Sequence, residues 1–337
     1  MTQTSKEAYL ARRPKGEPVL ADLQIREVEL PPLADGDVLV SNLWMSVDPY
    51  MRLYMSEYSG AHEPLPVNST LHGGAVGIVK ESRSPALPVG SYVLSQSKGW
   101  RDNYVDNEKA LELINPDLAP VQYQLGLLGR SGMTAYSGMC AILDPKPGDK
   151  VFVSGAAGSV GIIALQLAKI RGATVIGSSG STEKEEWLKS TFGLDSFINY
   201  RTDDIREKLS EFAPDGLDLY FDNVGGGHLE AAIDSMKLRG KIALSGAVAQ
   251  YNLPNYRGGP GNFFAIIERG LHLVGFTASQ HAEYKKEFTE DMARLEREGS
   301  LIWKETVIEG LDNAPAAFLD LLAGKNLGKM LVKISAD

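Results

Sequence analysis

Glycines at regular spacing are the clearest chemical signal in the sequence. Gly155, Gly158 and Gly161 follow a short apolar run and precede an apolar pattern of helical period. Between a strand and a helix, such glycines let the backbone approach a pyrophosphate, which the free N–H groups of the helix N-terminus bind. A glycine-rich turn in any α/β protein has similar residues, but the flanking strand and helix favour a dinucleotide. We therefore predict that this turn binds a dinucleotide.

Residues further along bear on which dinucleotide is bound. NAD enzymes usually carry an Asp or Glu at the end of the second strand, where it binds the ribose 2′-OH. Here Ser178 lies twenty residues after Gly158, among small residues and without an acidic one. This leaves room for a 2′-phosphate, with Lys184 near enough in sequence to pair with it. We expect NADP, although Lys184 could equally be a solvated residue in a helix capped by Thr182 and Glu185.

Two more segments follow predicted strands. Residues 222–226 end the strand predicted at 217–222, and residues 245–251 follow the strand predicted at 241–245. Ligands of open parallel sheets bind beyond the carboxyl ends of the strands. We expect both segments to face the nicotinamide half of the dinucleotide.

Residues that could bind a metal are scarce. Catalytic zinc needs three protein ligands, and the histidines lack ligand spacing; they are His62, His72, His228, His272 and His281. Cys140, the single cysteine, lies in an apolar, helix-like stretch, where we expect it to be buried as a small hydrophobe. One cysteine also excludes a disulfide within the chain and a multi-cysteine metal site. We expect no metal, so that a bound cofactor must carry the chemistry.

The elements that must position these residues divide the chain. Residues 1–125 hold short β-like runs between Pro- and Gly-rich turns, which predicts a compact β-rich domain. Residues 126–300 alternate between strands and helices, which predicts an α/β fold with a doubly wound parallel sheet. Residues 301–337 add a strand, a helix and a last strand. In the alternating part we predict strands at 150–154, 173–178, 196–199, 217–222, 241–245 and 271–274, and helices at 159–171 and 182–192.

Composition limits the partners. The 337 residues carry a formal net charge of -9 and a pI of about 5.2, which argues against a nucleic acid. No run of 18 apolar residues is present, so we predict no membrane span. The N-terminal residues lack the apolar segment of an export signal. With one cysteine, the chain fits a reducing, cytoplasmic setting.

Longer segments along nearly the whole chain carry a family resemblance. They include Ser46-Val-Asp-Pro-Tyr-Met-Arg52, Gly73-Gly-Ala-Val-Gly77, Gly132-Met-Thr-Ala-Tyr136, Tyr220-Phe-Asp-Asn-Val-Gly-Gly226 and Asn326-Leu-Gly-Lys329. With them the sequence resembles the zinc-independent medium-chain dehydrogenase/reductases, in the branch of prostaglandin reductases and alkenal double-bond reductases that includes bacterial curcumin reductases. The first segment is distinctive of this branch, whereas the glycine motif is shared much more widely.

The resemblance implies a fold and an activity. It implies a GroES-like catalytic domain formed by residues 1–125 with residues 301–337, and a Rossmann NADP-binding domain formed by residues 126–300. It also implies NADPH-dependent reduction of a carbon–carbon double bond conjugated to a carbonyl, as in 2-alkenals and enones. The partner would be a small hydrophobic substrate, and because relatives commonly dimerise, a second copy of the chain.

The resemblance assigns the cofactor contacts residue by residue. The phosphate turn falls on residues 158–161, and the 2′-phosphate contacts fall on Lys184 and Tyr200, which favours the binding role of Lys184. By position alone, Tyr200 could be a strand-end aromatic and Asn326 a turn residue before Gly328. The assigned contacts are Gly158, Ser159, Val160, Gly161, Ser179, Lys184, Tyr200, Asn223, Ser245, Gly246, Ala247, Tyr251, Phe276, Thr277, Ala278 and Asn326.

Reduction of an enone places negative charge on the carbonyl oxygen while hydride adds to the β-carbon. A hydrogen-bond donor on that oxygen is worth roughly 3–4 kcal/mol, and a proton from solvent or a tyrosine then adds at the α-carbon. Some relatives carry a tyrosine shortly before a Gly-Phe pair, but residues 265–275 contain none. Tyr50 is therefore our first candidate for the catalytic tyrosine, and Tyr251 is the second. Tyr50 could equally be an aromatic wall of the substrate site.

Other functions are compatible with the sequence. A quinone oxidoreductase of the same superfamily would reduce quinones with NADPH and leave enals unchanged. A non-catalytic NADPH-binding protein would keep the phosphate turn without turnover of either substrate. A zinc alcohol dehydrogenase is disfavoured by the missing ligands.

Overall fold

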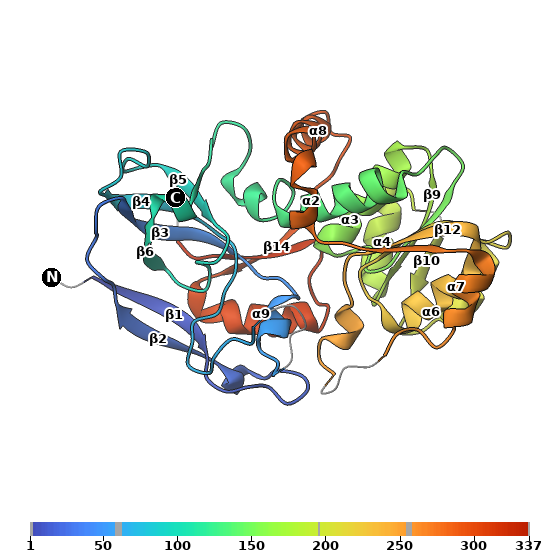
Figure 1. The fold of residues 1–337 in the computed structure, drawn as a ribbon, viewed down its shortest axis with the longest axis horizontal. Helices are drawn as coiled ribbons and strands as arrows, with labels where there is room; N and C mark the ends of the chain where they lie inside the picture. Colours follow the sequence, from blue (N-terminus) through green and yellow to red (C-terminus); the bar gives the residue numbers. More distant parts are fainter. Residues whose placement is uncertain (1–2, 58–62, 195, 254–257, 336–337) are drawn as a thin grey trace. The chain divides into compact units, whose positions relative to one another are not determined.

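The computed structural model describes residues 3–57, 63–194, 196–253 and 258–335. The chain forms two units, which we call unit 1 (Met1–Gly129 and Glu305–Asp337) and unit 2 (Arg130–Lys304). In sequence, unit 2 is thus inserted into unit 1 (Figure 1). The predicted fold class is confirmed, because unit 1 is rich in strands and unit 2 alternates strands with helices.

Unit 1 is built on two sheets. One pairs two strands, β1 and β2, antiparallel, and the other has seven strands in the order β14-β15-β3-β4-β5-β7, with β6 also paired to β3. The strands are β1 (Thr4–Leu10), β2 (Leu23–Glu29), β3 (Asp37–Ser46), β4 (Ala75–Ser82), β5 (Tyr92–Ser95), β6 (Asn103–Asn107), β7 (Glu112–Leu113), β14 (Glu305–Glu309) and β15 (Lys329–Lys333). The helices are α1 (Met51–Tyr54) and α9 (Ala314–Leu322), with short 3₁₀ turns at Leu20–Asp22, Glu108–Ala110, Val121–Leu125 and Leu311–Asn313.

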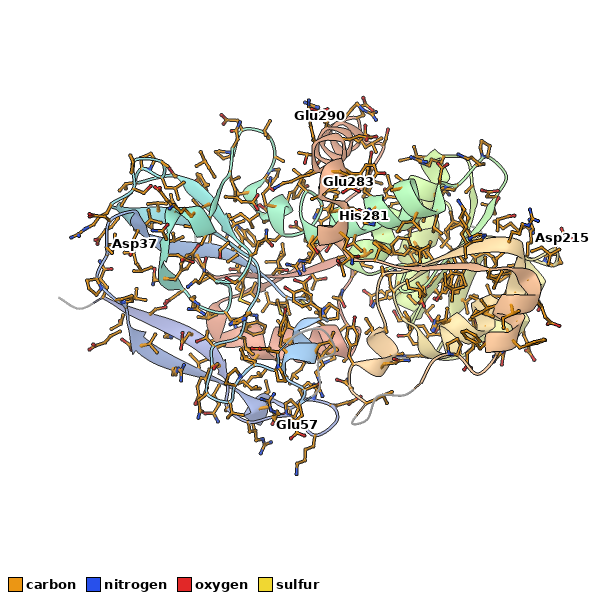
Figure 2. All side chains as sticks on the ribbon, viewed as in Figure 1. Asp37, Glu57, Asp215, His281, Glu283 and Glu290 are labelled. Atoms are coloured by element: carbon orange, nitrogen blue, oxygen red, sulfur yellow. The ribbon has the colours of Figure 1, made fainter. Side chains whose placement is uncertain are left out.

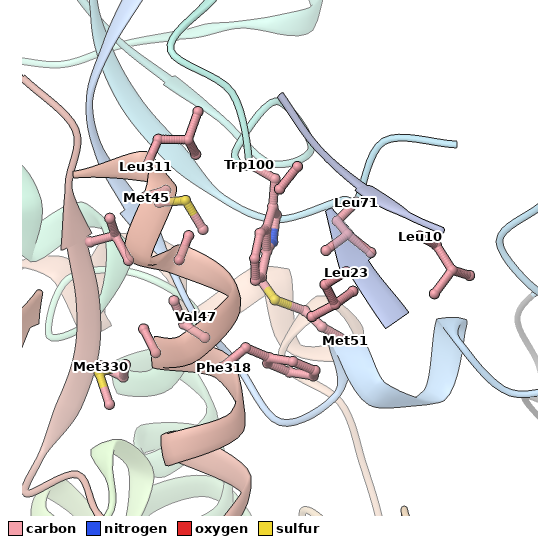
Figure 3. Packing of buried hydrophobic residues seen from close by; sticks show 14 of the residues in the cluster. Leu10, Leu23, Met45, Val47, Met51, Leu71, Trp100, Leu311, Phe318 and Met330 are labelled. Atoms are coloured by element: carbon pink, nitrogen blue, oxygen red, sulfur yellow. The ribbon is translucent and has the colours of Figure 1, made fainter. Parts of the chain in front are cut away.

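Aromatic and sulfur-containing side chains fill the core of unit 1 (Figure 3). Trp100 is fully buried and meets Phe318 of α9 edge-on, with 5.9 Å between the ring centroids. Met51 of α1 lies in the same core. A helix of four residues is unstable alone, and α1 is held by this burial and by Arg52, which donates to the Gly16 carbonyl at 2.7 Å.

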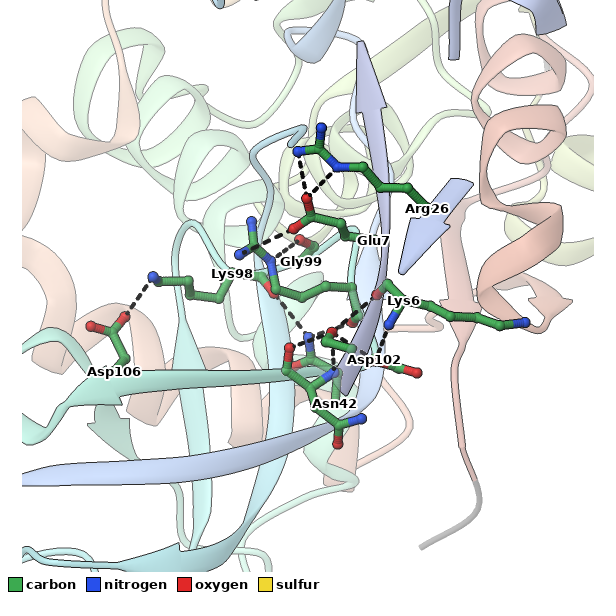
Figure 4. A network of polar contacts seen from close by, with 11 residues as sticks. Lys6, Glu7, Arg26, Asn42, Lys98, Gly99, Asp102 and Asp106 are labelled. Atoms are coloured by element: carbon green, nitrogen blue, oxygen red, sulfur yellow. Dashed lines mark hydrogen bonds and ion pairs between the residues drawn. The ribbon is translucent and has the colours of Figure 1, made fainter. Parts of the chain in front are cut away.

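A polar network attaches the two-stranded sheet to the rest of unit 1 (Figure 4). Glu7 of β1 pairs with Arg26 of β2 at 2.7 Å and lies 3.9 Å from Arg101. Asp102 Oδ1 accepts from the Ser5 hydroxyl at 2.8 Å and from the backbone N–H of residue 6 at 2.9 Å. Because these groups come from three separate segments, the network fixes β1 and β2 on the larger sheet.

Unit 2 contains a six-stranded parallel sheet in the order β10-β9-β8-β11-β12-β13. The strands are β8 (Lys150–Val153), β9 (Thr174–Ser179), β10 (Ser196–Asn199), β11 (Leu217–Asp222), β12 (Met236–Leu244) and β13 (His272–Gly275). The helices are α2 (Arg130–Tyr136), α3 (Ser159–Ile170), α4 (Thr182–Phe192), α5 (Ile205–Phe212), α6 (Gly226–Ser235), α7 (Phe263–Arg269) and α8 (Lys285–Arg297), with a π-helical stretch at Ser137–Leu143 and 3₁₀ turns at Val248–Gln250 and Ala278–Tyr284.

Helices cover both faces of this sheet. Crossovers between parallel strands are right-handed as a rule, so the reversal of strand order after β10 assigns α3 and α4 to one face and α5, α6 and α7 to the other. The second group packs side by side (Figure 1). Leu209 of α5 and Ile233 of α6 are buried in one cluster with Phe152 and Tyr220 of the central strands. This packing makes the central strands a rigid base for the loops that follow them.

Cys140 departs from its expected burial. It lies in the π-helical stretch Ser137–Leu143 and is only partly buried. Gly138 takes the core side of that stretch, where a Cβ would come within 2.4 Å of the Phe221 ring. Cys140, two residues on, therefore points partly outward. Desolvation still raises the pKa of its thiol to about 11, so the thiol is protonated at neutral pH.

Among the described residues, no helix combines the length and the apolar character that a membrane span needs.

Candidate active site

The centre of the unit 2 sheet marks a position for a ligand. Chain order across the sheet reverses between the neighbouring strands β8 and β11. In open α/β sheets ligands bind at such a switch point, outside the carboxyl ends of the strands. The glycine turn follows β8 and residues 223–226 follow β11, so both predicted segments lie at this edge.

The glycine turn has a geometry that only glycine allows. Gly155 has φ of 61°, and its carbonyl accepts from the Gly158 N–H at 2.9 Å. At Gly161 a Cβ would lie 2.2 Å from the Gly155 carbonyl oxygen, so a side chain there would displace the backbone. Helix α3 begins at Ser159, and among the described residues no side chain caps its N-terminus. The N-terminal N–H groups and the helix dipole can therefore bind an anion.

The ends of β9 and β10 form a second polar site. Ser179 pairs in register with Asn199, which brings Gly180 beside the residues after β10. A Cβ on Gly180 would lie 2.6 Å from the Tyr200 hydroxyl and 3.1 Å from Arg201 Nε. Ser178 and Ser179 are buried, and their hydroxyls have no hydrogen-bond partner within the described part of the chain.

Lys184 reaches the same region from the first turn of α4. The cap of α4 is Ser181, whose Oγ accepts from the Lys184 N–H at 3.3 Å; the expected cap at Thr182 is wrong, because Thr182 is already the first helical residue. Lys184 is half-buried, and its pKa is lowered by desolvation and by the charge of Arg201. Two nearby cations, a tyrosine hydroxyl and unpartnered serines suit a ribose 2′-phosphate.

Sequence reasoning missed Arg201. The available signal was a basic residue directly after Tyr200, at the end of a predicted strand. Its significance depends on the pairing of β9 with β10, which brings it beside Gly180. Arg201 therefore joins Lys184 as a candidate phosphate ligand.

Asp222 anchors the turn after β11. It is fully buried, and its Oδ1 accepts from the Tyr220 hydroxyl at 2.7 Å, the Ser154 hydroxyl at 3.1 Å, and the N–H groups of Val224 at 2.9 Å and Gly225 at 2.8 Å. Burial raises the pKa of Asp222, and these hydrogen bonds oppose the shift. The carboxyl group thus holds both strand ends at the switch point. Ser154, which bonds across from the end of β8, was not among the predicted site residues.

Asn223 is oriented from both sides. Its Nδ2 donates to the Ser154 carbonyl at 2.7 Å, and its Oδ1 accepts from the Ser245 hydroxyl at 2.8 Å. A Cβ on Gly246 would lie 2.9 Å from the Asn223 carbonyl oxygen, so the segment after β12 approaches this turn closely. Asn223, Ser245 and Gly246, all predicted cofactor contacts, therefore lie close together, with Ser245 fixing the Asn223 amide.

The remaining predicted cofactor contacts of unit 2 differ in how far their side chains are exposed. Tyr251 is half-buried, and desolvation raises its pKa while the backbone of Ala247, hydrogen-bonded to its hydroxyl, lowers it. Phe276 is buried and packs edge-on against Phe221, so its backbone rather than its ring is available to a ligand. Thr277, next in sequence, is exposed.

In unit 1, Tyr50 lies where β3 turns into α1. It is half-buried, directly before the first residue of α1, and meets Tyr54 edge-on with 6.1 Å between ring centroids. The Tyr54 ring lies 6.3 Å from the His72 ring. Asn326, also in unit 1, is buried, and its Nδ2 donates to the Gly328 carbonyl at 2.7 Å.

Metal ligands are dispersed. Among the described residues no three His, Cys, Asp or Glu side chains lie close enough to hold a metal ion. In unit 2, His281 lies beside Glu283, with 3.6 Å between Nδ1 and Oε1, while Asp215 lies far from both (Figure 2). His62 lies outside the described residues.

Known proteins of similar sequence and structure are oxidoreductases. A family described as the N-terminal domain of oxidoreductase matches residues 6–114, and one described as zinc-binding dehydrogenase matches residues 159–296. The chain is 41% identical to prostaglandin reductase 1 of Bos taurus, over 94% of this chain and 95% of that protein. It is 36% identical to the NADP(+)-dependent 2-alkenal reductase of Nicotiana tabacum, over 99% and 98%. CurA of Vibrio vulnificus, crystallised in complex with NADPH, matches with a TM-score of 0.93 at 32% identity, covering 98% of this chain and 100% of that one.

Proposed function

The chain belongs to the prostaglandin reductase and alkenal double-bond reductase branch of the medium-chain dehydrogenase/reductases, and we propose that it reduces carbon–carbon double bonds conjugated to a carbonyl. It is an NADP-dependent oxidoreductase that acts on 2-alkenals and enones. The observation that carries this function is the pair of cations, Lys184 and Arg201, beside two buried hydroxyls at the end of β9 in a chain of this family.

The two units take different roles in this proposal. Unit 2 is the Rossmann domain that binds NADP, and unit 1 is the GroES-like catalytic domain. In unit 2 the N-terminus of α3 binds the pyrophosphate, Ser179 binds the ribose, and Lys184, Tyr200 and Arg201 bind the 2′-phosphate. Residues 223–226, 245–251 and 276–278 of unit 2 and Asn326 of unit 1 are assigned to the nicotinamide half.

The chemistry requires a donor for the carbonyl oxygen. NADPH, when bound, supplies a hydride from C4 of its nicotinamide ring. We assign Tyr50 to donate a hydrogen bond to the substrate carbonyl oxygen, where negative charge develops as the β-carbon is reduced. The anchoring of α1 by Met51 and Arg52 supports this role, because a donor must be held in place before the charge forms.

The proton at the α-carbon is assigned to solvent. Tyr251 is the alternative, but burial raises its pKa, which makes proton release less favourable. Tyr251 is therefore retained as a cofactor contact on the segment after β12, beside Ala247.

We also propose that the enzyme needs no metal and that it is cytoplasmic. The reaction proceeds without a metal, because hydride transfer and one hydrogen-bond donor suffice for an enone. We also place the enzyme in the cytoplasm, in keeping with its single cysteine.

We propose a homodimer formed through the β13 edge of unit 2. β13 is the last strand in the sheet order among the described residues, and apolar side chains are exposed on it and on α7. Phe263, Phe264 and Ile267 are 61%, 67% and 63% exposed, and Val274 of β13 is 39% exposed. An edge strand beside an apolar patch favours pairing with a second copy about a twofold axis.

A substrate panel tests the function. Oxidation of NADPH and of NADH would be followed at the nicotinamide absorbance with a 2-alkenal, an enone, a quinone and a simple ketone, each with and without a metal chelator. We expect NADPH-dependent turnover of the enal and enone, unaffected by the chelator. Turnover of the quinone alone would replace this function by quinone reduction, and tight NADPH binding without turnover would indicate a non-catalytic protein.

A further inference from the structure

Lys329 is a buried charged residue that the chemistry above does not use. It begins β15 and is 1% exposed. Its Nζ donates to the Val47 carbonyl at 3.0 Å and to Asp48 Oδ1 at 2.5 Å. The other carboxylate oxygen of Asp48 accepts from the Ser46 hydroxyl. An ammonium group is unfavourable in this position unless it is paired, so the contacts are specific to the charge.

The ion pair joins two segments that lie 281 residues apart in the sequence. Val47 and Asp48 lead from β3 into α1, and Tyr50 follows two residues later. On the other side, Asn326 lies three residues before Lys329. The Val47 N–H also donates to the backbone carbonyl of residue 330 at 3.2 Å, so the side-chain contacts extend the backbone pairing of β15 with β3.

The Asn326 segment is also held from β14. The Thr306 hydroxyl donates to the Leu327 carbonyl at 2.7 Å and accepts from the Leu327 N–H at 3.0 Å. With Asn326 bonded to Gly328, these contacts fix the shape of the segment but not its relation to the turn at Tyr50. The pairing of β15 with β3 sets the register of the two segments, and Lys329 Nζ adds the side-chain contacts that reach Val47 and Asp48, next to the turn at Tyr50.

Stability alone does not account for the pair. Well-packed apolar residues in place of a buried ion pair are often neutral or stabilising, whereas removal of one partner is strongly destabilising. An apolar pair would fill the same space without fixing the direction of the Asp48 backbone. The hydrogen bonds from Lys329 Nζ to the Val47 carbonyl oxygen and to Asp48 Oδ1 do fix the direction of that backbone.

We propose that Lys329 is a positioning residue, whose ion pair with Asp48 holds Tyr50 and Asn326 in one fixed relation. The inference rests on the proposed function, in which Tyr50 polarises the substrate carbonyl and Asn326 contacts the nicotinamide. A displacement of about 1 Å in such groups lowers turnover by roughly 100-fold, so loss of the ion pair reduces kcat while the phosphate contacts in unit 2 still bind NADPH.

Variants separate positioning from stability. Lys329→Met leaves Asp48 unpaired and lowers both the unfolding midpoint and kcat. The double variant Lys329→Met with Asp48→Asn removes both charges, so the midpoint recovers towards wild type while kcat for an enal stays about 10- to 100-fold low. NADPH affinity, measured by fluorescence titration, stays close to wild type in both. Asp48→Asn alone keeps an oxygen for the ammonium group and lowers kcat less than Lys329→Met.

A matched control lies in the same unit. Arg26→Met breaks the pair with buried Glu7, remote in sequence from Tyr50 and Asn326 (Figure 4). It should lower the unfolding midpoint and leave kcat and KM unchanged. Recovery of kcat together with the midpoint in the double variant would overturn the positioning role. Failure of the wild-type enzyme to reduce enals would instead overturn the proposed function, so the two failures are distinguishable.

Discussion

At the scale of single residues, we propose that the charges beside β9 define the cofactor preference. Burial and the charge of Arg201 lower the pKa of Lys184, whereas Glu183 opposes the shift, so the like charge of Arg201 repels the Lys184 ammonium group. A 2′-phosphate relieves this repulsion and accepts charge-assisted hydrogen bonds from both. We therefore expect the preference for NADPH over NADH to depend mainly on these two side chains.

Removal of either charge tests this preference. Lys184→Ala and Arg201→Ala should each lower kcat/KM for NADPH by about 10- to 100-fold, because a hydrogen bond to a charged group contributes about 1.5–3 kcal/mol. Activity with NADH should change little. Lys189→Ala on the same helix, where Lys189 pairs with Glu185, is the control. Equal losses with both dinucleotides would contradict a 2′-phosphate role.

The proposed role of Tyr50 as hydrogen-bond donor can be tested by removing its hydroxyl. Tyr50→Phe removes one hydroxyl and should lower kcat/KM for an enal by about 100- to 1000-fold, as expected for loss of a donor to a developing oxyanion. Tyr54→Phe, on the adjacent ring, is the control. Little change in Tyr50→Phe would leave Tyr50 only a role as an aromatic wall.

His228 gives unit 2 a pH-dependent stability. It is 6% exposed, stacks on Phe152 with 6.4 Å between centroids, and burial lowers its pKa from 6.5 to about 4. Between these values the unfolded chain takes up a proton that the folded chain does not. Stability is therefore fully present above pH 6.5 and falls as pH drops to about 4, by about 1.4 kcal/mol per pH unit.

His228→Phe tests this coupling, because phenylalanine keeps the stacking and removes the titration. Denaturant unfolding of both proteins at several values between pH 7 and pH 4 should give a steeper loss of stability in the wild type. Parallel curves would show that His228 does not couple folding to pH.

At the scale of elements, we propose that the β8–α3 turn determines cofactor binding. Gly161→Ala places a Cβ 2.2 Å from the Gly155 carbonyl oxygen and must displace the turn. Such overpacking costs roughly 1–3 kcal/mol of stability, and NADPH affinity should fall by at least about tenfold because the N–H donors move with the turn. Gly227→Ala, where the described residues leave open space, is the control. Unchanged affinity in Gly161→Ala would contradict the pyrophosphate assignment.

Several elements were predictable because their signals are local. The strands Ser196–Asn199 and Leu217–Asp222 lie at the predicted bounds, since each is a short apolar run between turns. The cap of α4 was misplaced by one residue, because Ser181 and Thr182 are both good caps and only the backbone distinguishes them. Helix α7 was not predicted, since its exposed apolar residues give no amphipathic pattern.

At the scale of the whole molecule, the exposed edge of unit 2 predicts the oligomeric state. Light scattering of the wild type should give twice the chain mass of 36.5 kDa. Phe264→Glu combined with Ile267→Glu places charges in the apolar patch and should give the single-chain mass. Leu113→Glu, at an exposed apolar position of unit 1, is the control. A wild type of single-chain mass would contradict the homodimer.

Long-range relations explain which parts of the site sequence reasoning could not reach. The glycine turn was predictable because its residues are contiguous. The bond between Ser154 and Asp222, 68 residues apart, depends on the pairing of β8 with β11, and the pair Lys329–Asp48 depends on the return of the chain to unit 1. Local patterns contain no information on such pairings, so Arg201, Ser154 and Lys329 emerge only from the folded chain.

In the proposed reaction, the enzyme delivers hydride to the β-carbon of a conjugated carbonyl. The most direct test uses NADPH deuterated at C4 of the nicotinamide, on the face that the enzyme uses, with a 2-alkenal, and locates the deuterium in the product by NMR. The expected product is a saturated aldehyde with one deuterium at the β-carbon. Deuterium at the carbonyl carbon of an allylic alcohol would contradict it, because the enzyme would then reduce the carbonyl and not the double bond.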